Sequence, residues 1–123
     1  MAVEQHTPAE RQLVLRYFEM WNTGDSTVAG EVLHPEWRDH AHPEITGPDD
    51  VRRAVEHVRA AQPDLRFDIS AVLSEGELLA VVGEVDRGVG SAATVSGLIW
   101  LIRVRDGLLA EMWTYHASSV SAS

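Results

Sequence analysis

The apolar residues of this chain change their spacing near residue 64, and no other feature of the sequence constrains the fold as strongly. Up to Pro63 they recur every three to four residues, the spacing that gives an α-helix one apolar face. From Leu65 onward they alternate with polar residues, as in β-strands with one buried face. The sequence therefore predicts helices first and strands afterwards, an order typical of α+β domains.

Turn residues divide both parts into shorter elements. Apolar stripes predict helices over about residues 8–21, 26–33 and 48–62. Alternation predicts strands over about residues 65–73, 78–87, 94–105 and 108–116, with one further strand possible at 37–41. The first of these strands is predicted to carry Leu65, Phe67, Ile69, Ala71 and Leu73 on one face. We expect a single domain, residues 1–123, in which three N-terminal helices cover one face of a curved antiparallel sheet.

A histidine-rich stretch, LHPEWRDHAH, joins the second predicted helix to the third. In a strand, Trp37 and Asp39 would point to one face and His40 and His42 to the other, because side chains alternate along a strand. Only one of these sets can line an enclosed cavity. The alternative is a polar loop whose histidines are solvated. His34, His40 and His42 match no established spacing of metal ligands, so we predict no metal site.

Composition argues against several kinds of chemistry and partner. The chain has no cysteine, which excludes disulfides and thiolate nucleophiles, and it has no lysine to form a Schiff base. A net charge of −9 disfavours nucleic acid as a partner. No apolar run is long enough to cross a membrane, and the first residues do not resemble a signal peptide. We therefore expect a cytoplasmic protein that works with carboxylate, imidazole or phenol groups.

Five segments in this order carry a resemblance to a known family: YFEMWNTGD, WRDH, GPDDVR, QPDLRF and RDGLLAEMW. With the order of elements, they resemble the nuclear transport factor 2-like (NTF2-like) superfamily, and within it the SnoaL-like polyketide cyclases. The resemblance covers about residues 8–116. It implies a cone-shaped α+β fold, also described as a cystatin-like α+β barrel, which encloses an apolar cavity. Such a cavity suits enolate chemistry without a cofactor, and we predict none.

The resemblance implies roles for particular residues. Tyr17 precedes Asp25 by eight residues, as does the tyrosine that ketosteroid isomerases place in their oxyanion hole. Asp39 falls close to the catalytic base of those isomerases, and His40 matches the histidine of an Asp-His pair common in SnoaL-type sequences. We expect Asp39 or His40 to be the base. The alternatives are a tyrosine that belongs to the core and an aspartate that faces water.

The last predicted strand departs from the family pattern. Trp113 and Tyr115 share one of its faces, with His116 on the other. Tyr115 occupies a region where epoxide hydrolases and SnoaL-type cyclases carry an aspartate, and Trp100 stands where isomerases carry a second oxyanion donor. Tyr115 is therefore the alternative to Tyr17 as the proton donor.

The expected ligand is a small hydrophobic or aromatic substrate. Its predicted binding residues are Trp37, Phe67, Asp86, Trp100, Trp113 and His116. The alternative for the aromatic residues is ordinary core packing. Glu84 and Asp86 share one face of their predicted strand and are a candidate acid/base pair of the cavity. The alternative for this pair is a strand that emerges into solvent.

The predicted function is a cofactor-independent cyclase or isomerase that acts on a polyketide-like or aromatic carbonyl compound by acid/base chemistry. Two other functions stay open: a non-catalytic binding protein with the same fold, and an epoxide hydrolase of the limonene-epoxide type in which Asp39 and Asp86 activate water. We also expect a homodimer, because an apolar outer sheet face is usually covered. With Trp100 pointing inward, the residues predicted on that outer face are Val81, Val85, Ile99 and Leu101.

Overall fold

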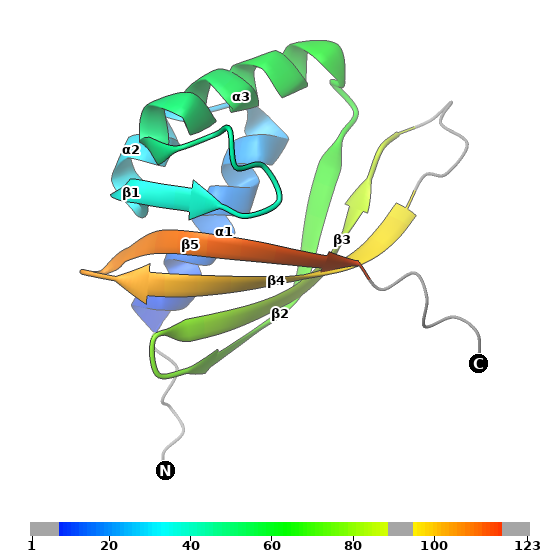
Figure 1. The fold of residues 1–123 in the computed structure, drawn as a ribbon. Helices are drawn as coiled ribbons and strands as arrows, with labels where there is room; N and C mark the ends of the chain where they lie inside the picture. Colours follow the sequence, from blue (N-terminus) through cyan, green and yellow to red (C-terminus); the bar gives the residue numbers. More distant parts are fainter. Residues whose placement is uncertain (1–7, 89–94, 117–123) are drawn as a thin grey trace, which may run out of the picture.

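The computed structural model of the chain describes residues 8–88 and 95–116. It has a layer of helices, formed by the part with helical spacing of apolar residues, and a sheet formed mainly by the part with alternating spacing (Figure 1). The helical layer consists of α1 (Pro8–Thr23), the short 3-10 turn η2 (Ser26–Val28), α2 (Ala29–Val32) and α3 (Gly47–Ala61). The sheet consists of β1 (Leu33–Asp39), β2 (Arg66–Glu75), β3 (Leu78–Asp86), β4 (Val95–Arg105) and β5 (Leu108–His116). The helices lie on one side of the sheet, which curves around them without closing (Figure 1). The predicted α+β fold is confirmed.

β1 is the element that the sequence described least well. The strand order is β1-β5-β4-β3-β2, and β2 to β5 are antiparallel neighbours as predicted. β1 pairs with β5 in parallel, so the sheet is mixed. It begins at Leu33, which was expected to end the second helix but has extended backbone angles. Pro35 disfavours helical geometry at His34, the residue before it, so the helix has no room to continue past Leu33.

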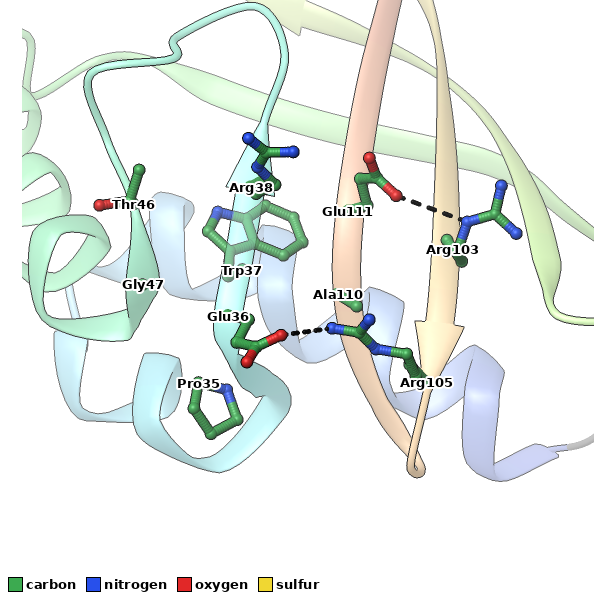
Figure 2. Close-up of a pocket in the computed structure, with 10 residues that line it drawn as sticks. All are labelled: Pro35, Glu36, Trp37, Arg38, Thr46, Gly47, Arg103, Arg105, Ala110 and Glu111. Atoms are coloured by element: carbon green, nitrogen blue, oxygen red, sulfur yellow. Dashed lines mark hydrogen bonds and ion pairs between the residues drawn. The ribbon is translucent and has the colours of Figure 1, made fainter.

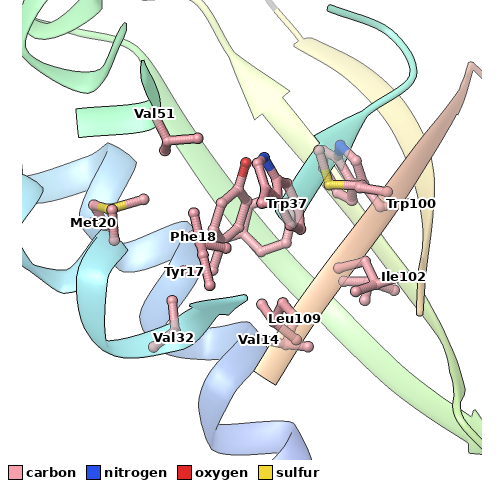
Figure 3. Packing of buried hydrophobic residues seen from close by; sticks show 14 of the residues in the cluster. Val14, Tyr17, Phe18, Met20, Val32, Trp37, Val51, Trp100, Ile102 and Leu109 are labelled. Atoms are coloured by element: carbon pink, nitrogen blue, oxygen red, sulfur yellow. The ribbon is translucent and has the colours of Figure 1, made fainter. Parts of the chain in front are cut away.

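The core lies between α1 and the inner face of the sheet, and aromatic rings fill much of it (Figure 3). Tyr17 and Phe18 of α1 meet Trp37 of β1 and Trp100 of β4. Ring centroids lie 4.6 Å apart for Phe18 and Trp100, 5.0 Å for Tyr17 and Phe18, and 5.6 Å for Tyr17 and Trp37. All four side chains are at most 3% exposed. These rings therefore pack against one another as the central part of the core.

A β-bulge in β2 changes which residues face the helices. The register between β2 and β3 shifts between Ile69 and Ala71, so that the predicted alternation holds only as far as Ile69. Beyond the bulge Val72 packs against the core, while Leu73 is 59% exposed on the outer face. The bulge faces Gly83, where an added Cβ would lie 2.4 Å from a backbone oxygen of β2. Only glycine accommodates this close approach.

Two residues predicted on the outer face of the sheet lie inside. Val81 pairs with Trp100 across β3 and β4, and both are buried; Val85 is also buried. Ile99 and Leu101 do lie on the outer face, on the side of β4 opposite Trp100. The prediction for Val81 and Val85 was wrong because cross-strand partners share a face, and the partners of β3 were not known from the sequence.

Asn22 fastens α1 to the edge strand β2. Its Nδ2 donates to the carbonyl oxygen of Phe67 at 2.9 Å, and its Oδ1 accepts the N–H of Phe67 at 2.7 Å. An Asn22→Ala variant leaves both part-buried backbone groups without these partners. We therefore expect the free energy of unfolding to fall by about 1–3 kcal/mol, measured by urea denaturation. The exposed Gln12→Ala variant is the control, and an equal loss in both variants would contradict this role for Asn22.

Candidate functional site

Asp39, the last residue of β1, is a carboxylate turned into the molecule. It is only 9% exposed, because the alternation of β1 places it on the same side as the buried Trp37. Its Oδ1 accepts the N–H of Ala41 at 3.0 Å, and its Oδ2 lies 3.4 Å from Nδ1 of His42. The turn that follows β1 thus holds the carboxyl group in one orientation.

α1 presents the hydroxyl group of Tyr17 to the same interior. The side chain is 3% exposed. Burial raises the pKa of Tyr17 far above its usual range, the Asp39 carboxylate raises it further, and a hydrogen bond with Trp21 lowers it. The phenol therefore stays protonated at neutral pH and is able to donate a hydrogen bond. Tyr17 packs against Trp37, which shares the inner face of β1 with Asp39.

Trp37 brings a third polar group to this place. Its Nε1 is buried and has no hydrogen-bond partner among the described residues. The Trp37 and Tyr17 rings are tilted by 44° to each other, and the indole nitrogen and the phenol oxygen lie at the same end of the ring pair (Figure 3). Asp39, Tyr17 and Trp37 together form what we call the interior polar cluster.

The interior polar cluster combines a proton acceptor with hydrogen-bond donors in a place from which water is largely excluded. A carboxylate is able to remove a proton from a carbon next to a carbonyl group. A phenol or an indole N–H is able to stabilise the negative charge that then develops on the carbonyl oxygen. This arrangement fits enolate chemistry.

His40, the other predicted base, lies on the opposite side of β1. Its ring stacks on Trp113 of β5, with centroids 4.7 Å apart and planes 5° apart. Its Nε2 lies 2.7 Å from Oε2 of Glu111. The structure thus brings Asp39 to Tyr17 and separates His40 from both, because successive residues of a strand point to opposite faces.

The last strand turns its aromatic residues outward. Trp113 and Tyr115 share a face as predicted, opposite Leu101 and Ile99 of the outer face, and Tyr115 is 52% exposed. The structure therefore places both on the outer face of the sheet and Asp39 on the inner side. The alternation was right, but it does not say which of the two faces meets the helices.

The other predicted binding residues lie in several places. Trp100 is buried in the core, and His116 is exposed at the end of β5, paired with Leu98. Phe67 lines a groove of about 440 Å³ along α1 and β2. Asp86 lies on the outer side of β3, opposite the buried Val85, and its Oδ1 accepts the N–H of Gly88 at 2.9 Å. The structure does not bring Asp86 to Asp39.

A second groove, of about 470 Å³, opens on the outer side between β1 and β5 (Figure 2). The register between these two strands shifts there, between Leu33 and Arg38. Charged side chains line it, and Arg105 lies 3.0 Å from Glu36 across its mouth. Trp37 of the interior polar cluster also lines this groove, together with Pro35 and Ala110.

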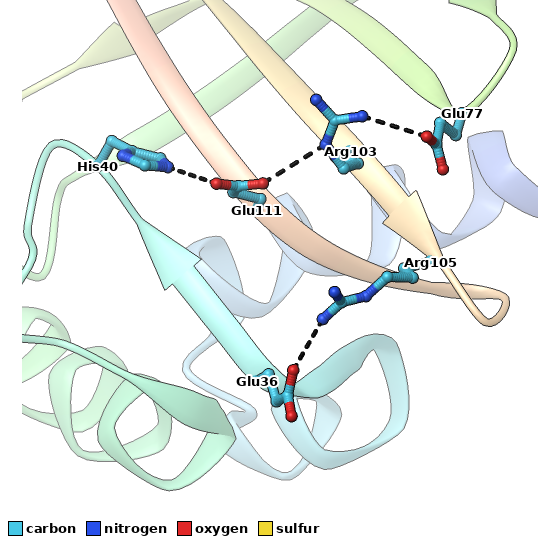
Figure 4. A network of polar contacts seen from close by, with 6 residues as sticks. All are labelled: Glu36, His40, Glu77, Arg103, Arg105 and Glu111. Atoms are coloured by element: carbon cyan, nitrogen blue, oxygen red, sulfur yellow. Dashed lines mark hydrogen bonds and ion pairs between the residues drawn. The ribbon is translucent and has the colours of Figure 1, made fainter.

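Glu111 connects His40 and Arg103 beside this groove (Figure 4). It bonds to His40 and lies 3.4 Å from Arg103, which also contacts Glu77 at 3.2 Å. The hydrogen bond from His40 is the main cause that lowers the pKa of Glu111, and Arg103 adds to it.

The lowered pKa of Glu111 predicts a pH-dependent stability. Its contribution is present above the ordinary glutamate value of about 4.3 and is lost as the pH falls through the lower value of the folded state. We expect Glu111→Gln to cost a few tenths to about 1 kcal/mol near pH 6 and progressively less as the pH falls below about 4, measured by urea denaturation. Glu75→Gln, at an exposed strand end, is the control. A cost that persists unchanged at the acid end would refute this assignment.

The three histidines of the polar stretch contact three different acidic residues. His34 lies 3.2 Å from Asp106, His40 contacts Glu111, and His42 contacts Asp39. Within residues 8–88 and 95–116, no group of three or more His, Cys, Asp or Glu side chains is placed to hold a metal ion. None of the helices in these residues is long and apolar enough to span a bilayer.

The chain is similar to one family and to several solved structures. Residues 14–112 match the SnoaL-like domain. TsrD from Streptomyces laurentii is 23% identical, with 90% of each chain covered and a TM-score of 0.73. A proposed polyketide cyclase from Bacillus cereus is 17% identical, with 96% of this chain and 80% of that chain covered and a TM-score of 0.78. A SnoaL-like polyketide cyclase from Agrobacterium tumefaciens is 15% identical, with 89% and 91% covered and a TM-score of 0.69. No curated protein sequence matches the chain significantly.

Proposed function

The chain belongs to the SnoaL-like domain family, and on that premise we propose that it is a cyclase or isomerase of small carbonyl compounds that uses no cofactor. The observation that carries the proposal is the buried carboxylate of Asp39 on the same face of β1 as Trp37, the ring against which the buried Tyr17 packs. The polyketide cyclases among its structural neighbours support the same class of reaction. The aromatic rings around the pair favour a hydrophobic or aromatic substrate.

In the proposed reaction Asp39 removes a proton from the carbon next to the substrate carbonyl. The electron pair of the broken C–H bond forms a carbon–carbon double bond, and the carbonyl oxygen becomes an enolate oxygen. The Tyr17 hydroxyl donates a hydrogen bond to this oxygen as its charge grows. An isomerase then returns the proton to another carbon, whereas a cyclase lets the enolate carbon attack a second carbonyl carbon, whose oxygen takes up the proton from Asp39.

Proton exchange tests this proposal without knowledge of the natural substrate. The protein is incubated in deuterium oxide with a panel of cyclic enones and aromatic diketones, and deuterium at the carbon next to the carbonyl is followed by NMR. We expect exchange above the buffer rate for at least one compound. Exchange at the buffer rate throughout, with compounds that bind, would refute the acid/base role.

A non-catalytic binding protein is the second candidate. It is favoured by the inner side of β5, where the described residues Met112, Thr114 and His116 include no carboxylate. In this case a bound carbonyl compound is recovered unchanged and without deuterium after long incubation. The third candidate, epoxide hydrolysis through Asp39 and Asp86, is weakened because Asp86 lies on the outer side of β3. Diol formation from a panel of epoxides would restore it.

We propose that the protein forms a homodimer through the outer face of the sheet. Four large apolar side chains are exposed among the described residues: Leu73, Val95, Ile99 and Tyr115. All four lie on β2, β4 and β5. Ile99 and Tyr115 are direct neighbours across β4 and β5, and an exposed apolar patch on a sheet face marks an interaction site.

An Ile99→Arg variant is expected to convert the dimer to a monomer of 13.6 kDa, because it puts a charge at the centre of the apolar face. Light scattering coupled to gel filtration measures the mass. Gln12→Arg adds the same charge on the exposed side of α1 and should leave the dimer intact. A wild-type protein that is monomeric at about 100 μM would contradict the proposed dimer, since specific dimers usually bind more tightly than that.

A further inference from the structure

The indole N–H of Trp37 is a hydrogen-bond donor buried in the core. Trp37 is 1% exposed, and its Nε1 has no hydrogen-bond partner among the described residues. Most buried polar groups in proteins are paired, because removing a donor from water without a new partner is unfavourable. The ring itself is held firmly between the sheet and α1, so the free N–H is a fixed feature of the core (Figure 3).

The neighbouring polar groups do not use this N–H. Asp39 lies two residues further along β1 on the same face, but its oxygens accept from the Ala41 N–H and lie against His42. Tyr17 packs directly on the Trp37 ring, and its hydroxyl lies at the same end of the ring pair as Nε1 (Figure 3). Two donors, one from α1 and one from β1, therefore lie close together in the interior beside one carboxylate.

We propose that the Trp37 indole N–H and the Tyr17 hydroxyl together bind one ligand oxygen, the atom that carries the negative charge of an enolate or phenolate. Identifying this oxygen as that of a reaction intermediate rests on the proposed function. The class of ligand follows from the donors: a single oxygen anion on a flat apolar ring or chain. A carboxylate or phosphate has further charged oxygens that two donors cannot satisfy.

An indole suits this role because it donates a hydrogen bond and accepts none. It also carries no charge at any working pH, so it does not compete with Asp39 for the proton. In a place with little water, such a donor acts more strongly on a developing anion than it would at the surface. The Tyr17 phenol has the same advantage because it stays protonated.

The test removes the N–H and keeps the shape of the ring. Trp37 is replaced by 3-benzothienylalanine, in which sulfur stands in place of the N–H group, and the probe is 4-nitrophenolate. Both proteins also carry Asp39→Asn, which removes the competing negative charge and the proposed base. We expect the loss of the N–H to weaken 4-nitrophenolate binding by roughly tenfold to a hundredfold, the range for a hydrogen bond to a charged group. Binding of neutral 4-nitroanisole, which has a similar size, should change less than about twofold.

A second readout does not depend on replacing the residue. In protein labelled with 15N-tryptophan, the indole signal of Trp37 is identified by its absence from the benzothienyl variant. On addition of 4-nitrophenolate this signal should move downfield more than those of the other three tryptophans. Equal phenolate affinity with and without the N–H, an indole signal that does not move, or no phenolate binding at all would each overturn the inference.

These results separate the inference from the proposed function. If the Asp39 carboxylate is not the base, proton exchange survives in Asp39→Asn, yet phenolate binding still depends on the N–H. If only the inference is wrong, Asp39→Asn abolishes exchange, and the affinity for 4-nitrophenolate is the same with Trp37 and with 3-benzothienylalanine.

Discussion

An Asp39→Asn variant should exchange the substrate proton about 10²–10⁴ times more slowly than the wild-type protein, the usual contribution of a general base. The amide cannot accept the proton, but its oxygen is still able to accept the Ala41 N–H that fixes the turn after β1. We therefore expect the variant to fold with little change in melting temperature. Exchange is measured by NMR in deuterium oxide, with melting followed by circular dichroism.

The control for this variant is Asp64→Asn, an exposed aspartate ahead of β2. It makes the same chemical change away from the interior polar cluster and should exchange at the wild-type rate. Full activity in folded Asp39→Asn would refute Asp39 as the base. His40 would not take over this role, because it lies on the other side of β1 against Trp113 and Glu111.

A Tyr17→Phe variant should lower the exchange rate by about 10²–10³, the range observed when one oxyanion donor is removed. The phenylalanine ring keeps the packing against Phe18 and Trp37. The free energy of unfolding should change by no more than about 1 kcal/mol, because the substitution removes a single neutral hydrogen bond.

The pH dependence gives an independent check on Tyr17. Burial and the Asp39 carboxylate raise the pKa of Tyr17, so the hydroxyl remains a donor across the neutral and mildly alkaline range. We expect no loss of the wild-type rate between pH 7 and about 9.5, below the ordinary tyrosine value of about 10. An equal rate in Tyr17→Phe and wild type would show that the hydroxyl belongs only to the core.

The sequence predicted most of the fold because hydrophobic spacing is a local signal. The helix expected at 8–21 is α1 (Pro8–Thr23), and the strand expected at 108–116 is β5 (Leu108–His116). Spacing does not say which strands become neighbours. The parallel pairing of β1 with β5 and the bulge after Ile69 depend on contacts between distant segments, and neither was predicted.

The candidate site was predicted only in part. Alternation correctly separated Asp39 from His40, but the burial of Trp37 decided which of them faces inward. The contact between His42 and Asp39 had a local signal, since an aspartate at a strand end often bonds to the next residues of a turn. No local signal pointed to the Trp37 N–H, which has no partner within residues 8–88 and 95–116, because its surroundings depend on how the rings of α1 and β1 pack.

The most direct measurement is proton exchange by the wild type, the two single variants and the double variant Asp39→Asn, Tyr17→Phe under one set of conditions. If both residues act on the same enolate, the double variant should be little slower than Asp39→Asn alone, because groups that act as a unit are not additive. Its folding is verified by circular dichroism. Exchange by the folded double variant at the wild-type rate would contradict the proposed site.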